Sequence, residues 1–237
     1  MCAVFLGRTG GHSGGPYRSF NLAGWVGDEP SAVDRNWRRF DAEFPSRRIT
    51  RLRQVHGAAV RTIESAESPP ADGDGMVTAI AGITLGIFTA DCVPLLMIDP
   101  QRRICAAIHA GWRGTLARIA SEGVVAMSRL GARANSIHAA LGPAIGGCCF
   151  EVDTGLAERF ADVAGGKHIR AGRPGKAYLS LRAILREQLE RCGVRRESII
   201  SVGPCTRCAY DRFFSRRAMA DGVTGLQLSF IGLDQSA

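Results

Sequence analysis

Apolar residues recur at helical spacing in three segments of the chain: residues 31–44, 115–130 and 180–192. In the first segment Val33, Trp37 and Phe40 lie three or four positions apart, and Ser31 can cap the N-terminal end. Each of the other two segments is followed directly by a glycine, which commonly ends a helix. The pattern therefore predicts three amphipathic helices.

Shorter apolar runs between these segments predict buried strands. The expected strands or extended pieces cover residues 49–63, 83–98, 103–108, 136–141, 198–202 and 226–231. The most apolar run is interrupted by a polar group at residues 89–92 and contains Pro94, which a central strand tolerates poorly. We expect a strand, a break and a second extended piece there. Because helices alternate irregularly with strands, the pattern predicts a layered α+β fold.

The length of 237 residues suits a single domain over residues 1–237, large enough to merge two subdomains. The net charge of +8 is almost entirely arginine, since only Lys167 and Lys176 are lysines. No block of five basic residues occurs, and aromatic residues do not alternate with basic ones. We interpret the charge as spread over the surface, with no nucleic acid as partner.

No run of about 18 apolar residues is present, so we expect no membrane span. The first eight residues, MCAVFLGR, are too soon interrupted by charge for a signal peptide, which favours a cytoplasmic protein. In that compartment the eight cysteines should stay reduced. A cysteine near histidines is then better interpreted as a ligand or nucleophile than as half of a disulfide.

Three potential metal ligands, His56, Cys92 and His109, lie within or at the ends of apolar segments. Burying such polar groups costs free energy unless they are paired. Two imidazoles and a thiolate suit zinc, and three protein ligands leave the fourth position open, as in catalytic zinc sites. The spacings of 36 and 17 residues are unlike those of a zinc finger. Taken singly, a buried histidine or cysteine is more often an ordinary core side chain than a ligand.

A glycine-rich loop follows His109. Gly111 and Gly114 permit close approach of the backbone to a ligand. The start of the helix expected at residues 115–130 presents free N–H groups, with the guanidinium of Arg113 beside them. We expect an anion such as phosphate at this place.

Short motifs that follow one another along most of the chain extend these observations. They are GGHSGGPY at residues 10–17, FNL at 20–22, GD at 27–28, QVHG at 54–57, DGMVT at 74–78, TADCVP at 89–94, HAGWRG at 109–114, GPAIG at 142–146, CFEV at 149–152, CT at 205–206 and FFS at 213–215 with Arg217. In this order they resemble the YfiH/YlmD laccase-domain family, also called the purine nucleoside phosphorylase or multicopper polyphenol oxidoreductase family.

The resemblance implies an α+β fold with mixed sheets, flanking helices and two merged subdomains. It implies one zinc ion per chain, bound by His56, Cys92 and His109. The implied activity is phosphorolysis of purine nucleosides, including adenosine, inosine and methylthioadenosine, with adenosine deamination as a second activity. The expected partners are therefore purine nucleosides and phosphate, and the protein is expected to act as a monomer or homodimer.

Further residues follow from the neighbourhood of the ligands. Cys92, His109 and Asp91 are predicted to be catalytic. Asp91 adjoins a ligand and could accept a proton or orient that ligand, although a capped turn explains it equally well.

Four residues are predicted to bind substrate. Arg113 and Arg8 are candidate phosphate clamps, because a guanidinium can bind phosphate through two hydrogen bonds. Asn21 and Cys149, which lie in two of the matching motifs, are predicted as further substrate contacts.

Cys208 departs from the family pattern, because with Cys205 it forms a Cys-x-x-Cys pair that the pattern lacks. A single Cys-x-x-Cys pair is weak evidence for a second metal site, and we interpret it as incidental.

Three other functions remain open at this point. Two histidines and a cysteine could bind copper for phenol oxidation. However, five histidines without a His-x-His pair are too few for a multinuclear copper cluster. Alternatively, Cys92 could act as a nucleophile with His109 as its base, or with zinc, in amide hydrolysis of peptidoglycan precursors. A non-catalytic binding module is the remaining alternative, and an open zinc position argues against it.

Overall fold

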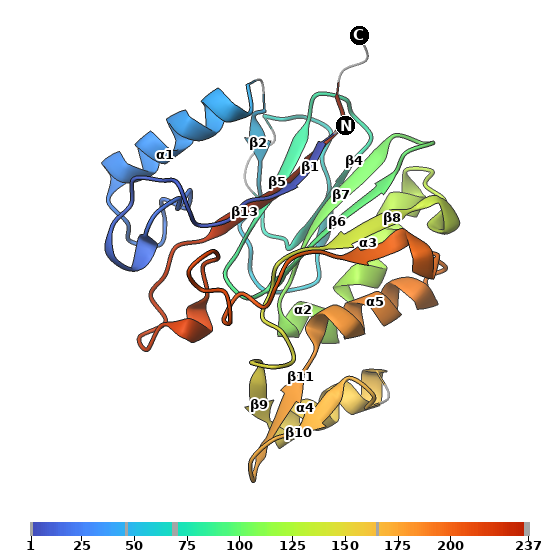
Figure 1. Cartoon of the computed structure of the whole chain (residues 1–237). Coiled ribbons are helices and arrows are strands. Elements are labelled where there is room, and N and C mark those ends of the chain that lie inside the picture. The colour runs from blue at the N-terminus through green and yellow to red at the C-terminus, as the bar shows by residue number, and fades with distance from the viewer. Residues whose placement is uncertain (1, 46, 68–70, 165, 235–237) are drawn as a thin grey trace.

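Mixed sheets and flanking helices make up the computed structural model, which describes residues 2–45, 47–67, 71–164 and 166–234 (Figure 1). The described α-helices are α1 (Pro30–Glu43), α2 (Trp112–Leu116), α3 (Ile119–Arg129), α4 (Thr154–Ala164) and α5 (Leu181–Arg191). The strands are β1 (Cys2–Phe5), β2 (Ile49–Thr50), β3 (Val60–Thr62), β4 (Gly75–Thr78), β5 (Thr84–Thr89), β6 (Val93–Asp99), β7 (Ile104–Ala110), β8 (His138–Leu141), β9 (Glu151–Asp153), β10 (Ile169–Ala171), β11 (Lys176–Leu179), β12 (Ile199–Ser201) and β13 (Gln227–Gly232). The α+β prediction is confirmed.

Three sheets organise these strands. A six-stranded sheet has the order β12-β8-β6-β7-β4-β3, and a four-stranded sheet has the order β1-β13-β5-β2. In the six-stranded sheet the two outer pairs are parallel, and the strands between them are antiparallel. The third sheet, β10-β11-β9, is small and antiparallel.

The two large sheets pack face to face between helices. Alternate residues of β7 point to opposite faces, because side chains in a strand have a period of two. Ile104, Ala106 and Ile108 join the core shared with α3 and α5, whereas Cys105 and Ala107 join the core against the four-stranded sheet. A third cluster of buried residues fills the space between α1 and the four-stranded sheet. The resulting order of layers is α1, four-stranded sheet, six-stranded sheet, and α3 with α5.

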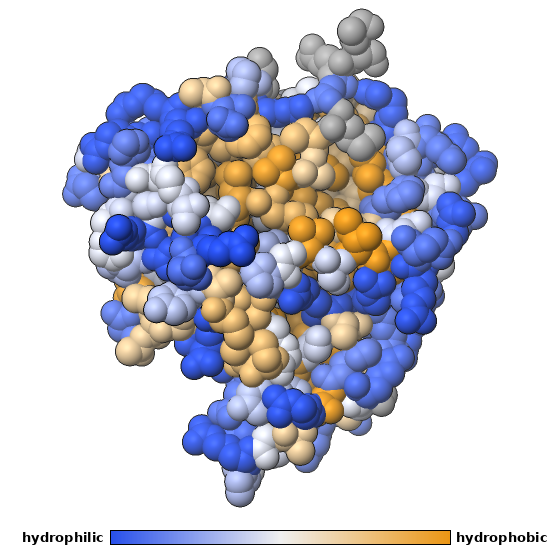
Figure 2. Space-filling model, viewed as in Figure 1, coloured by the Kyte–Doolittle hydropathy of each residue, from blue (hydrophilic) through white to orange (hydrophobic). Residues whose placement is uncertain are grey.

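The small sheet and α4 form a unit at one end of the molecule (Figure 1). Its apolar residues, including Phe160 and Leu179, belong to the same cluster of buried residues as α3 and α5. This continuity is consistent with the expected merging of two subdomains. Figure 2 shows apolar residues gathered in the middle of one face of the molecule, with hydrophilic residues around its edges.

The predicted helix at residues 31–44 is α1, and the predicted helix at residues 180–192 is α5. Val33 and Phe40 are buried on the inner face of α1. The N-cap of α1 is Glu29, not Ser31 as predicted, because Pro30 occupies the first helical position. Proline suits that position since the N–H it lacks would have no partner there.

The helix predicted at residues 115–130 is two helices. Helix α2 begins at Trp112, three residues earlier than predicted, and α3 begins at Ile119. Arg118 separates them with a left-handed backbone, at φ 59°. The apolar stripe continues through the interruption, which explains why the pattern did not reveal it.

The expected break in the most apolar segment is confirmed. Strand β5 ends at Thr89 and β6 begins at Val93. Pro94 pairs with His109 of β7, and on the other side its carbonyl accepts from the N–H of Gly142, just beyond β8, at 2.8 Å. Within the described part of the chain, no helix has the length and apolar character needed to cross a membrane.

Candidate metal centre

The hairpin formed by β6 and β7 places two of the predicted ligands. Pro94 pairs with His109 and Val93 with Ala110, so Cys92 enters β6 beside the point where His109 leaves β7. His109 lies on the same face of β7 as Cys105 and Ala107, which is turned toward the four-stranded sheet, and Cys92 approaches it from just before β6. The hairpin thus brings together two residues that lie far apart in sequence.

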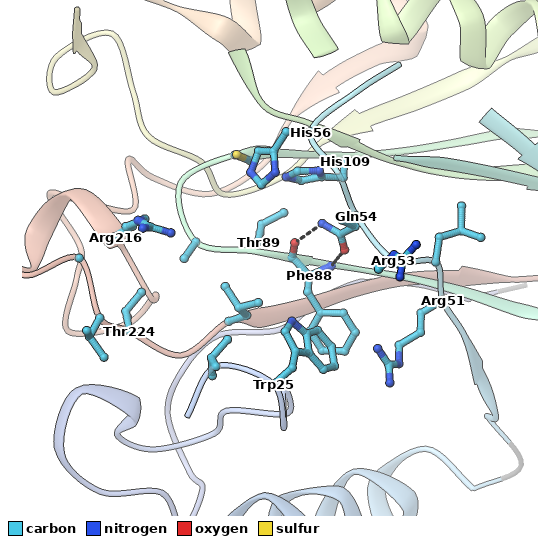
Figure 3. Close-up of a pocket in the computed structure, with 17 residues that line it drawn as sticks. Trp25, Arg51, Arg53, Gln54, His56, Phe88, Thr89, His109, Arg216 and Thr224 are labelled. Atoms are coloured by element: carbon cyan, nitrogen blue, oxygen red, sulfur yellow. Dashed lines mark hydrogen bonds between the residues drawn. The ribbon is translucent and has the colours of Figure 1, made fainter. Parts of the chain in front are cut away.

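The third ligand, His56, lies in a loop that is anchored on both sides. The amide of Gln54 donates to the carbonyl of Phe88 and accepts from its N–H, both at 2.8 Å (Figure 3). The N–H groups of His56 and Gly57 donate to the carboxylate of Asp74 at 2.9 and 2.6 Å. These contacts hold the loop between β5 and β4.

The ligand atoms of His56, Cys92 and His109 all lie within 4.8 Å of one another. The two imidazole rings meet edge to face, with centroids 4.8 Å apart. His109 is buried, Cys92 is half-buried and His56 is exposed, so the group is open on one side. Two nitrogen donors and a thiolate with an open side fit a catalytic zinc ion.

Asp74 contacts two of the candidate ligands, and the sequence analysis did not single it out. Its carboxylate is buried and lies 2.8 Å from Nδ1 of His109. This contact fixes the ring orientation and leaves Nε2 of His109 for a metal, an arrangement typical of metal-bound histidines. The signal was present in the DGMVT motif, where an aspartate directly precedes a buried strand.

The charges in the group favour a thiolate at Cys92. Burial by itself would raise the pKa of the Cys92 thiol. The interactions with His109 and His56 outweigh this effect and lower the pKa to about 6. Burial by itself would lower the pKa of His109. The Cys92 thiolate and the Asp74 carboxylate outweigh this effect and raise the pKa to about 9. A thiolate is the form of cysteine that binds metals and attacks electrophiles.

Two non-glycine residues at this site have left-handed backbones. His56 has a φ of 59° and Asp91, which precedes Cys92, a φ of 92°. Such conformations cost free energy and persist only where surrounding contacts hold them. The contacts from Asp74 hold His56, and a separate network holds Asp91.

The carboxylate of Asp91 is buried and fully hydrogen-bonded. One oxygen accepts from the hydroxyls of Thr206 and Ser215 at 2.6 and 2.7 Å, and the other accepts from the N–H of Arg217 at 2.7 Å. Of the two roles considered for Asp91, this network favours orienting Cys92 over accepting a proton.

Gly111 allows the chain to pass directly beside the ligands. A β-carbon at this position would lie 3.1 Å from both the sulfur of Cys92 and Cδ2 of His56. The backbone of Gly111 is extended, so the requirement for glycine is one of space. This agrees with the close backbone approach that the sequence predicted.

The ligands lie in the wall of a cavity of about 790 Å³ (Figure 3). Trp25, Phe88 and Leu226 contribute apolar surface. Three arginines also line it: Arg51, Arg53 and Arg216. Arg216 lies across the cavity from the other two (Figure 3). An apolar cavity with a few convergent polar groups is typical of a small-molecule site.

The four predicted substrate residues are not among the described residues that line this cavity. Arg8 donates to the carbonyls of Arg18 and Tyr210, and Asn21 is fully buried. The exposed guanidinium of Arg113 lies over the ring of Trp112, 4.4 Å from its centroid.

Cys149, the fourth of these residues, lies beside other cysteines, at 3.4 Å from Cys208 between sulfurs. Its role in substrate binding, like those of Arg8, Asn21 and Arg113, stays a prediction.

Comparisons with known proteins agree with the fold and identify the family. Residues 2–234 match the family model described as multi-copper polyphenol oxidoreductase laccase. The chain is 40% identical to a purine nucleoside phosphorylase of Deinococcus radiodurans, over 97% of the chain and 88% of that protein. It is 35% identical to adenosine deaminase RL5 of an unknown prokaryotic organism, over 86% of the chain and 83% of that protein.

Solved structures show the same similarity in three dimensions. The crystal structure of YlmD from Geobacillus stearothermophilus superposes with a TM-score of 0.89 at 34% identity, covering 98% of this chain and 92% of that one. The structure of YfiH from Bacillus licheniformis has a TM-score of 0.90 at 29% identity, with the same coverage. The chain therefore belongs to the laccase-domain family of YfiH and YlmD, as its motifs predict.

Proposed function

We propose that this protein is a zinc-dependent purine nucleoside phosphorylase that acts on adenosine, inosine and methylthioadenosine and also deaminates adenosine. The observation that carries the proposal is the His56–Cys92–His109 group, open toward a cavity that has both aromatic surface and arginines. Relatives named purine nucleoside phosphorylase and adenosine deaminase support both reactions. We propose that the enzyme acts in the cytoplasm on purine nucleosides and phosphate, without a nucleic-acid or membrane partner.

The aromatic wall suits a purine base. Trp25 is 52% exposed, which is unusual for tryptophan, and its ring meets that of Phe88 edge to face at 4.9 Å. The guanidinium of Arg51 lies 4.3 Å from the centre of the Trp25 ring and restrains it from one side. A base that stacks on this wall would bury apolar surface that water otherwise contacts.

The cavity arginines suit phosphate, and their existing contacts distinguish them. Arg53 pairs with Asp72, and Arg51 lies over Trp25. Arg216, on the opposite side, is the guanidinium that we assign to the phosphate. It replaces Arg113 as the principal candidate, because Arg113 lies outside the cavity lining.

The two reactions differ in the bonds that form and break. In phosphorolysis a phosphate oxygen bonds to C1′ of the ribose, the bond from C1′ to the purine nitrogen breaks, and that nitrogen retains the electron pair and takes a proton. In deamination, water adds its oxygen to C6 of adenine and ammonia leaves. A bound zinc ion would supply Lewis-acid chemistry at this site. Trp25 and Phe88 would orient the base, and Arg216 would position the phosphate.

A second candidate function rests on the contact of Asp74 with His109. Cys92, His109 and Asp74 together form a thiol, an imidazole and an orienting carboxylate, the order found in cysteine hydrolases. Such an enzyme would cleave an amide, as in peptidoglycan precursors, and would not require a metal. The second imidazole beside Cys92, that of His56, favours the metal centre over this alternative.

The deciding experiment is metal analysis of the purified protein with product analysis on adenosine, with and without phosphate. Phosphate-dependent release of adenine supports the phosphorylase, and inosine formed without phosphate supports the deaminase. Loss of both products on removal of zinc, with recovery on its return, supports the metal centre. Amide cleavage that survives complete metal removal would instead establish the hydrolase.

A further inference from the structure

Four cysteines outside the candidate active site form a second cluster of potential ligands. Cys148 and Cys149 are adjacent in sequence, and Cys205 and Cys208 form the Cys-x-x-Cys pair. The chain fold brings the two pairs together, and all four sulfurs lie within 4.8 Å of one another. We propose that these cysteines bind a structural zinc ion, separate from the ion expected at the His56 group.

The distances between the sulfurs fit one tetrahedral ion. Zinc binds thiolate at about 2.3 Å, so four tetrahedral ligands lie about 3.8 Å from one another. The sulfur of Cys208 lies 3.8 Å from that of Cys148 and 3.4 Å from that of Cys149. An iron–sulfur cluster would place several atoms between the thiolates and hold them farther apart.

The backbone around the cluster is arranged as in metal sites built on thiolates. The N–H of Gly146 donates to the sulfur of Cys205 at 3.1 Å. A β-carbon on Gly146 would lie 3.1 Å from the sulfur of Cys148, so glycine keeps this turn close to the cluster. Hydrogen bonds from backbone N–H groups stabilise the negative charge of ligating sulfurs.

A nearby positive charge offsets part of the charge of such a site. Four thiolates and one Zn²⁺ carry a net charge of −2, and each thiol that is protonated beforehand releases its proton on binding. Nη1 of Arg207 lies 3.7 Å from the sulfur of Cys149. Arg207 lies in sequence between the two cysteines of the Cys-x-x-Cys pair, so its positive charge is close to the thiolates.

The ion would join two loops that both reach the active site. The loop after β8 donates from the N–H of Ile145 to the carbonyl of Asp91 at 2.9 Å. The other loop donates from the hydroxyl of Thr206 to the carboxylate of Asp91 at 2.6 Å. The loops already pair through Ala144 and Cys205. A metal that clamps them would therefore support the strained backbone before Cys92.

The test compares metal content in four forms of the full chain, each purified with zinc and a reductant. The wild type should contain two zinc ions per chain. The double variant Cys148→Ser/Cys208→Ser should contain one and unfold at a lower temperature. Cys192→Ser changes a cysteine outside the cluster and should retain two. Cys149 stays in place because it is also a predicted substrate contact.

The fourth form, Cys92→Ala, separates this proposal from the proposed function. It should retain one zinc ion, and cobalt in its place should show the strong thiolate-to-cobalt absorption of a tetrahedral all-sulfur site. Absence of that absorption, or one zinc in the wild type and none in Cys92→Ala, overturns the proposal. So does an intact mass two daltons low under these conditions, since it identifies a disulfide. The cobalt spectrum does not depend on whether the double variant folds.

Discussion

Asp74, which directly precedes β4, lies beside His109 at the end of the β4–β7 ladder, and the two residues are joined twice. The N–H of His109 donates to the carbonyl of Asp74 at 2.7 Å, and its Nδ1 lies 2.8 Å from the carboxylate. The same carboxylate accepts from the N–H groups of His56 and Gly57. One side chain therefore holds two of the three candidate metal ligands, and the backbone hydrogen bond to His109 holds Asp74 in place.

Replacing this carboxylate should weaken metal binding without unfolding the protein. In Asp74→Asn the amide N–H₂ would face the N–H of His56 or Gly57, and the negative charge beside His109 would be lost. We expect zinc affinity at this centre to fall by about 10- to 100-fold. Competition with a chelator measures the change. Asp72→Asn, which alters an exposed carboxylate paired with Arg53, should leave the affinity unchanged.

Cys92→Ala should remove the zinc of the active site and abolish both reactions on adenosine. The core does not depend on this side chain, so circular dichroism should report a folded protein. Cys192→Ala is the matched control and should retain metal and activity. If Cys92→Ala keeps the active-site zinc and loses only turnover, Cys92 acts as a nucleophile and the hydrolase alternative is favoured.

Gly111→Ala should weaken zinc binding through steric contact alone. Its β-carbon would lie 3.1 Å from the sulfur of Cys92, and either the ligand or the backbone must move. We expect activity to fall about tenfold or more, since small displacements of a reacting group are costly. Gly14→Ala is the control, because no atom lies within 4 Å of a β-carbon there. Equal activity in both variants would show that the loop adapts.

Arg216→Ala should reduce phosphorolysis more than deamination, because only phosphorolysis uses phosphate. Loss of a charge-assisted contact predicts about a 10- to 100-fold lower rate of adenine release at low phosphate. Inosine formation should change little. Arg113→Ala provides the comparison, since Arg113 is exposed and lies over Trp112. A selective phosphate defect in Arg113→Ala, with none in Arg216→Ala, would restore the assignment made from sequence.

The active-site metal should be zinc, and the zinc protein should be colourless. Removing it should stop adenine and inosine formation together, and zinc should restore both. Copper-loaded protein should not oxidise phenols at enzymatic rates, because five histidines cannot supply a mononuclear and a multinuclear copper site. Stoichiometric copper with an intense blue band and rapid phenol turnover would contradict this prediction.

Local pattern predicted the elements whose apolar stripe is continuous, such as α1 and α5. It did not predict α4, although Ala157, Phe160 and Ala164 recur at helical spacing and are buried. The three short strands that accompany α4 have half-exposed faces, which leave little apolar signal. The interruption at Arg118 depends on backbone conformation and leaves the stripe intact.

The sequence singled out the candidate metal ligands because their residue types are informative, but it did not single out the residues that hold them. Asp74 reaches His109 through strand register, which no local pattern specifies. The cysteine cluster joins residues about 60 positions apart, so the Cys-x-x-Cys pair looked incidental without its partners. Arg216 similarly reaches the cavity from a distant segment.

The register of the β6–β7 hairpin has a consequence for how this site is recognised in other sequences. Pairing runs from Val93 with Ala110 to Asp99 with Ile104, and the turn connects Asp99 to Ile104. Extra residues in the turn would lengthen the interval from Cys92 to His109 and leave both side chains on the same face. One extra residue within either strand would turn a ligand to the opposite face. Relatives should therefore keep each ligand on the same face of the hairpin, whereas the number of residues between Cys92 and His109 can vary with the length of the turn.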